Sequence, residues 1–149
     1  MRPSIAAVPF LLLSLASPAA AQMNPDRAGV EQAVLDYVNG FYTGDTTLFL
    51  RSVRPDVDKL GFSKDKTGVY QSEPFPWTQF FSFARQVRAG KQQPPAGAAK
   101  EVTVLDVQDQ TAAAKLRAYW GTDYFLLARY QGRWMIRQIM WQDPPPAKP

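Results

Sequence analysis

The chain has 149 residues, with 17 Lys and Arg against 13 Asp and Glu, and it contains neither cysteine nor histidine. This composition excludes disulfides, thiolate nucleophiles, Ser-His-Asp triads and zinc sites built from His or Cys. Acid–base chemistry would have to come from Asp, Glu, Tyr or Lys. The basic residues are scattered and form no stripe, so we expect no nucleic-acid binding.

The beginning of the chain has the three parts of an export signal. Arg2 supplies the positive charge, residues 6–15 form a short apolar stretch, and residues 19–21 are three alanines. This pattern predicts cleavage between Ala21 and Gln22 and an exported, periplasmic or secreted protein. The apolar stretch is too short to span a membrane, and we expect no membrane span elsewhere.

The remaining length suits one domain. We therefore expect a signal peptide over 1–21, a single domain over 22–143 and a disordered tail over 144–149. The absence of cysteine means that the domain must be stabilised by its apolar core, which a chain of this length can build.

The first half of the domain has the pattern of helices. Asn24 and Pro25 are typical of a helix start, and apolar residues follow at helical spacing until Gly40 or Gly44, either of which could end the helix. Asp45 predicts the start of a second, short helix.

That second helix must end before Pro55, which restricts the residue preceding it. Residues 60–72 suggest a small hairpin. A third helix is expected from about Pro76 to Gly90.

The second half alternates as strands do. The polar run 108–110 and the pairs Gly121-Thr122 and Gln131-Gly132 are the expected turns. The last strand alternates imperfectly at Arg137-Gln138. A bulge there would curve the sheet, whereas the alternative is an ordinary strand buried on both faces at its ends. The predicted strands are 102–107, 112–120, 123–130 and 134–141.

Several segments resemble the putative lumazine-binding branch of the nuclear transport factor 2-like, or cystatin-like, superfamily; they are residues 33–45, 54–56, 102–107, 123–128 and 132–141. The resemblance implies an α+β fold in which a curved antiparallel sheet, the cone, is covered on its concave face by N-terminal helices. It also implies a pocket and often a homodimer formed through the exposed sheet face. Relatives include isomerases and cyclases that use a pocket Asp, and also proteins without chemistry, so the fold selects no activity.

Two carboxylates are the candidate catalytic residues. Asp123 alternates onto the face of Phe125, where apolar neighbours would raise its pKa, although it could instead lie in solvent at the strand end or cap the Gly121-Thr122 turn. Asp56 could face the pocket, or it could cap a turn over 57–60. Many relatives have His-Pro-Asp where this chain has Arg54-Pro55-Asp56. Arginine cannot act as a base but can bind an anion.

Side chains that could line the pocket combine ring faces with polar atoms, although aromatic residues are also common in ordinary cores. We expect a small aromatic or amphipathic ligand and a homodimer, and no metal or cofactor, since no phosphate loop or ligand cluster occurs. The functions considered are small-molecule binding without catalysis, a homodimeric interaction module whose pocket is filled by its own side chains, and an isomerase, dehydratase or cyclase. The pocket candidates are Tyr37, Arg54, Tyr70, Trp77, Phe125 and Trp141.

Overall fold

The computed structural model describes residues 24–145, so the predicted export signal and residues 146–149 of the predicted tail lie outside the described residues. The described part forms an α+β fold of three helices and one six-stranded sheet. The helices are α1 (Pro25–Thr43), α2 (Thr46–Ser52) and α3 (Trp77–Arg88). The strands are β1 (Val53–Lys64), β2 (Tyr70–Pro74), β3 (Lys100–Val107), β4 (Thr111–Ala118), β5 (Gly121–Tyr130) and β6 (Arg133–Gln142).

The first two helices begin and end at residues whose side chains and backbones favour those ends. Asn24 Oδ1 accepts a hydrogen bond from the Asp26 amide at the start of α1, at 3.0 Å. The helix passes Gly40 and ends before Gly44, whose φ of 73° is the left-handed conformation that closes many helices. Asp45 then caps α2, as predicted, by accepting from the Thr47 amide at 2.9 Å.

The sheet has the strand order β2-β1-β6-β5-β4-β3. Its neighbours are antiparallel except for β1 and β6, which run parallel, so the sheet is mixed. Strand β1 is longer than the hairpin strand expected from the sequence. The turn predicted over 57–60 is therefore wrong, because these residues pair with β6 inside β1.

Of the two turns predicted on either side of β5, one is wrong and one is confirmed. Gly121 pairs with Ala118, so the chain turns at Tyr119-Trp120 and the predicted Gly121-Thr122 turn is wrong. The Gln131-Gly132 hairpin is confirmed, with positive φ at both residues.

The predicted bulge in β6 is also confirmed. Leu126 faces Gln138 while Leu127 faces Ile136, so Arg137 has no partner across the pair. A bulge of this kind bends its strand and increases the local twist of the sheet.

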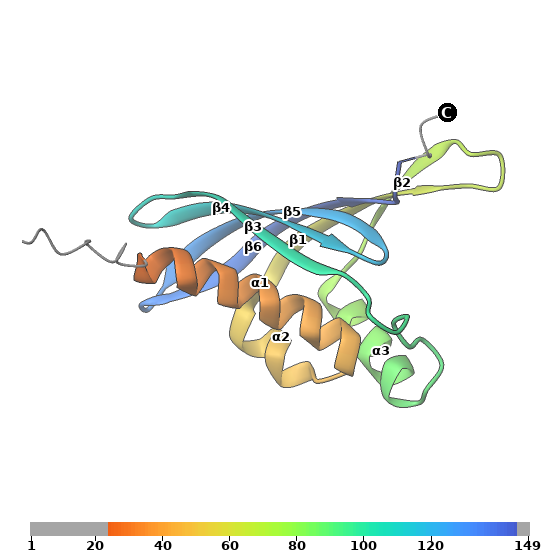
Figure 1. Ribbon diagram of the computed structural model, residues 1–149, viewed down its shortest axis with the longest axis horizontal. Coiled ribbons are helices and arrows are strands. Elements are labelled where there is room, and N and C mark those ends of the chain that lie inside the picture. Colours follow the sequence, from red (N-terminus) through yellow and green to blue (C-terminus); the bar gives the residue numbers. More distant parts are fainter. Residues whose placement is uncertain (1–23, 146–149) are drawn as a thin grey trace, which may run out of the picture.

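All three helices lie on one face of the curved sheet, and the other face is left uncovered by them (Figure 1). The β1–β2 hairpin extends beyond the body of the sheet. The core between helices and sheet is aromatic, with Tyr37, Phe49, Phe80 and Phe125 among its largest buried side chains. Within residues 24–145, no helix has the length and apolar character needed to cross a membrane.

Candidate functional site

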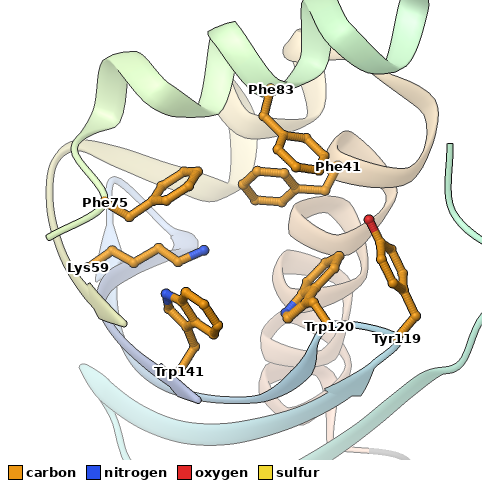
Figure 2. A pocket seen from close by; sticks show the side chains of 7 residues that line it. All are labelled: Phe41, Lys59, Phe75, Phe83, Tyr119, Trp120 and Trp141. Carbon is orange, nitrogen blue, oxygen red and sulfur yellow. The ribbon is translucent and has the colours of Figure 1, made fainter. Parts of the chain in front are cut away.

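A cavity of about 130 Å³ lies between the helices and the concave face of the sheet. Six of its seven lining side chains are aromatic, and the seventh is a lysine. They come from α1, β1, the segment before α3, α3 itself, the β4–β5 turn and β6, and they surround one common space (Figure 2). The lining residues are Phe41, Lys59, Phe75, Phe83, Tyr119, Trp120 and Trp141.

Lys59 is the charged group of this cavity. It lies on the inward face of β1, is only 7% exposed, and its amine points toward the centre of the ring-lined space (Figure 2). Its Nζ donates a hydrogen bond to Tyr37 Oη at 2.7 Å. Otherwise aromatic rings surround the ammonium, with favourable cation–π geometry. The distances from Nζ to ring centroids are 4.5 Å for Phe75, 5.0 Å for Phe41, 5.2 Å for Tyr37, 5.4 Å for Phe80 and 5.9 Å for Trp141.

A buried hydrogen-bonded chain continues from Lys59 across the core. The Tyr37 hydroxyl donates to Asp123 Oδ1 at 3.2 Å, and Trp120 Nε1 donates to Asp123 Oδ2 at 2.6 Å. Asp123 is fully buried on β5. The chain thus connects an amine that faces the cavity to a carboxyl group through a hydroxyl that can accept from one and donate to the other.

Burial shifts the pKa values of Lys59, Asp123 and Tyr37 in the direction that favours the neutral form of each group. It lowers the pKa of Lys59 from 10.5 to about 8, and the negative charge of Asp123 opposes this shift. Burial likewise raises the pKa of Asp123, against the charge of Lys59 and the hydrogen bonds from Trp120 and Tyr37. The pKa of Tyr37 lies well above its usual value because of burial and then because of the Asp123 charge.

Trp141 forms the wall of the cavity on the β6 side. Its indole lies against the backbone of β1 at Gly61, where a Cβ atom would overlap the ring. Glycine at this position therefore permits the close approach that places the indole beside Lys59. Within the described residues, the Trp141 Nε1 atom is buried and has no hydrogen-bond partner.

The structure brings four of the predicted site residues together. Tyr37 and Asp123 form the polar chain described above, and Trp141 lines the cavity. Phe125 lies behind them as core, with its ring centroid 5.1 Å from that of Tyr37. The inward orientation predicted for Asp123 is therefore correct, and its alternative as a cap of the Gly121-Thr122 turn is not, because no turn lies there.

The other four predicted site residues do not line the cavity. Arg54 forms an ion pair with the exposed Asp56 at 3.2 Å and stacks over Tyr130. Tyr70 lies on the exposed β1–β2 hairpin, with Lys64 over its ring. Trp77 is partly buried at the start of α3 and packs against the core through Phe80 and Phe81.

Six of the seven lining residues were not among the predicted pocket residues, namely Phe41, Lys59, Phe75, Phe83, Tyr119 and Trp120. Lys59 was counted among the scattered basic residues, and Tyr119 was placed inside the predicted strand 112–120. Tyr119 instead lies in the turn after β4, where strand alternation no longer applies, and it lines the cavity with Trp120. The missed signal for Lys59 was its two-residue spacing from Val57 and Gly61, which places it on the inward face of a strand.

The site offers acid–base and nucleophilic groups rather than metal ligands. Among the described residues, no cluster of three Asp, Glu, His or Cys side chains could hold a metal ion. The amine of Lys59 can donate to an acceptor oxygen of a ligand, or act as a nucleophile when neutral. Tyr37 and Asp123 can supply or take up a proton behind it.

Comparison with known proteins places this fold and cavity in a family. The sequence matches the family described as putative lumazine-binding over residues 25–142, which is nearly all of the described chain. The chain belongs to the putative lumazine-binding family. No match was found among the curated proteins.

Solved structures of nuclear transport factor 2-like proteins share the fold. One from Methylobacillus flagellatus KT, of unknown function, is 19% identical, with a TM-score of 0.64 over 84% of this chain and 97% of that one. Another of unknown function, from Shewanella baltica OS155, is 14% identical, with a TM-score of 0.61 over 84% of this chain and 98% of that one. A protein with a cystatin-like fold from Novosphingobium aromaticivorans is 15% identical, with a TM-score of 0.56 over 83% and 84%. At these identities the likeness establishes the nuclear transport factor 2-like, cystatin-like fold alone.

Proposed function

We propose that this protein binds a small, flat aromatic molecule through its ring-lined cavity, with an acceptor oxygen of the ligand facing Lys59. The observation that carries this proposal is the buried amine of Lys59 at the edge of a cavity whose other walls are aromatic. Ring walls favour a planar apolar body, and a small number of polar groups fix its orientation.

The size and charge of the cavity narrow the ligand further. An apolar cavity of about 150 Å³ in a protein core can hold benzene, so a cavity of about 130 Å³ suits a single ring. The resident cation of Lys59 disfavours cationic ligands and favours carboxylates, phenolates or carbonyl compounds. The family's description names lumazine, a flat heterocycle that shares the planarity and carbonyl oxygens of this ligand class but has two fused rings and is larger than the single ring that the cavity volume suits.

Matched single-ring probes test this proposal. Benzoate, benzyl alcohol and benzylamine have similar shapes and carry a negative, no and a positive charge. We expect benzoate to bind most tightly and benzylamine least, as measured by calorimetry and by quenching of tryptophan fluorescence from Trp120 and Trp141. Lumazine belongs in the same series as a larger probe.

The controls for this titration are two lysine substitutions. Lys59→Met keeps an unbranched side chain of similar length and removes the charge, so it should abolish the preference for benzoate. Lys66→Met, at the exposed tip of the β1–β2 hairpin, should leave binding unchanged. Failure of every probe to bind, or equal binding of benzoate by Lys59→Met, would overturn the proposal.

We also propose that two copies of the chain associate through the outer face of the sheet. This face carries four large apolar side chains between 47% and 54% exposed, namely Leu105, Tyr124, Leu126 and Met140. They lie close together over β3, β5 and β6, since Tyr124 pairs with Met140 and all four line one shallow hollow. Exposed apolar patches of this kind favour association. In a dimer with twofold symmetry, the patch of one subunit would contact the same patch of the other subunit. The resemblance to relatives that dimerise through this face supports a second copy as the partner.

Light scattering on the purified protein tests the dimer. We expect the mass of two chains for the wild type and of one chain for Leu126→Glu, which places a charge within the patch. Val69→Glu introduces the same charge at an equally exposed position on the distant hairpin and should remain dimeric. A wild-type monomer at micromolar concentration would contradict this proposal.

We further propose that the protein is exported and that its mature form begins at Gln22. This proposal rests on the positive, apolar and small-residue parts of the N-terminal sequence. Intact mass spectrometry of the protein recovered from the periplasm or the medium should give the mass of the chain without residues 1–21. Retention of the full-length chain inside the cell would contradict it.

A further inference from the structure

We infer that Lys59 is a covalent site for carbonyl compounds: its amine condenses with an aromatic aldehyde or ketone seated in the cavity to form an imine. This inference rests on the proposed aromatic-ligand site and names the reactive class of ligand within it. It goes beyond binding because it assigns a bond-forming group.

The position of the amine supports this reaction. Lys59 Nζ faces the cavity (Figure 2). The centroids of the Phe41, Phe75 and Trp141 rings, which line the same cavity, lie 4.5–5.9 Å from Nζ. A planar carbonyl compound lying between these rings would therefore present its carbonyl carbon to the nitrogen. Holding the two reactants in such proximity lowers the entropic part of the barrier.

The surroundings also favour the neutral, nucleophilic form of the amine. Rings and core side chains replace the water that would stabilise an ammonium, which is why the pKa of Lys59 falls to about 8. Burial in an apolar pocket is one of the established ways to activate a lysine for imine formation. Because the imine is uncharged, its formation also removes the charge that the cavity solvates poorly.

The reaction balances with the groups present. The nitrogen lone pair attacks the carbonyl carbon, a C–N bond forms, the carbonyl π bond breaks, and the nitrogen gives up a proton as the oxygen gains one. In the second step the C–O bond breaks as a second N–H proton is lost, and a proton delivered to the oxygen lets it leave as water. The products are one imine and one water, with no oxidant or reductant required.

Tyr37 and Asp123 are placed to move the protons of both steps. The Tyr37 hydroxyl lies 2.7 Å from the nitrogen and can exchange a proton with it or with the departing oxygen. The carboxyl group of Asp123 lies 3.2 Å beyond and can exchange a proton with the hydroxyl, and burial raises its pKa above the usual value. Tyr119 is the other titratable group that lines the cavity, whereas α3 and β6 present the rings of Phe83 and Trp141.

Reductive trapping tests the inference. The purified wild-type protein is incubated at pH 8 with limiting benzaldehyde and sodium cyanoborohydride, which reduces an imine to a stable benzylamine. At that pH a lysine with a pKa of about 8 holds roughly a hundredfold more neutral amine than one at 10.5. Peptide mapping by mass spectrometry should therefore find the benzyl group on Lys59 ahead of the exposed Lys66.

Two additional measurements make the outcome decisive. Lys59→Arg keeps the positive charge but forms no imine, so the dominant labelled peptide should disappear. Benzoate, which occupies the cavity without reacting, should protect Lys59 in the wild type and leave Lys66 unprotected.

Labelling of Lys66 but not Lys59 in a protein that still binds benzoate overturns the imine while the binding proposal stands. Absence of both benzoate binding and Lys59 labelling overturns both. The wild-type peptide map requires no variant, so misfolding of Lys59→Arg would not leave the question open.

Discussion

Replacing Lys59 by Met should change how the stability of the protein depends on pH. Methionine is unbranched and similar in length, and it packs well among aromatic rings, so the ring cage can accept it. The substitution removes one buried charge and its hydrogen bond to Tyr37. It leaves Tyr37 able to donate to Asp123.

The magnitude follows from the pKa of Lys59. Its shift from 10.5 to about 8 is about two and a half pKa units, and at 1.36 kcal/mol per unit this equals about 3 kcal/mol. Because the folded pKa is the lower one, the unfolded chain binds more protons between pH 8 and pH 10.5. The free energy of unfolding contributed by this group therefore rises with pH across that window.

We expect Lys59→Met to be more stable than the wild type at pH 7 and this advantage to shrink by about 3 kcal/mol on going to pH 10.5. Urea denaturation followed by circular dichroism at several pH values measures the difference directly. The contributions of titrating groups common to both proteins largely cancel in the difference between their free energies of unfolding. The free energy of unfolding of Lys66→Met should change with pH in parallel with that of the wild type. A constant difference between pH 7 and pH 10.5 would refute the assignment of a desolvated cation at Lys59.

Two further substitutions address the neighbours of Lys59. Asp123→Asn removes the negative charge that raises the pKa of Lys59. The midpoint of the pH profile of benzaldehyde trapping at Lys59 should therefore shift below pH 8. An unchanged or higher midpoint would contradict the electrostatic interaction between Asp123 and Lys59. Gly61→Ala should destabilise the protein by about 1–3 kcal/mol in urea denaturation and weaken benzoate binding, because the new Cβ overlaps the Trp141 indole. Unchanged stability and binding would show that the indole does not lie across β1.

Local signals in the sequence predicted most of the secondary structure. Asn24 and Asp45 cap helices through their own side chains, so their effect can be recognised without knowledge of the fold. The alternation of β5 placed Asp123 inward for the same reason, since a strand with a period of two fixes the face of each residue. The bulge at Arg137 was visible as a break in that period.

The start of β1 could not be predicted in this way. Arg54, Pro55, Asp56 and Asp58 are charged or lack an amide hydrogen, which argues locally for a turn. The strand forms there because its parallel partner, β6, lies about eighty residues later in the chain, and Lys59 pairs directly with Ile139. The error hid the inward position of Lys59, and with it the polar centre of the cavity.

The long sequence separation between β1 and β6 also explains why only Trp141 of the six pocket candidates lines the cavity. Tyr37, Tyr70 and Trp141 were all chosen as aromatic residues with a polar atom, but only Tyr37 and Trp141 lie on elements that face the covered side of the sheet. Arg54 was chosen for its ability to bind an anion, and neither it nor Tyr70 lies on a strand position that faces the cavity. Chemistry identifies a site residue only after the register of its strand is known.

Stability does not account for a lysine at position 59. The charge costs about 3 kcal/mol relative to the unfolded chain, and an apolar residue in the same ring cage would avoid that cost. A structural role in fixing the position of β1 would need a polar group bonded to Tyr37, but it would not require that group to face a cavity. The amine of Lys59 does both, since it bonds to Tyr37 on one side and lines the aromatic space on the other. The fold does not require the amine of Lys59 to face the cavity, and that exposure to the cavity is what a ligand would use.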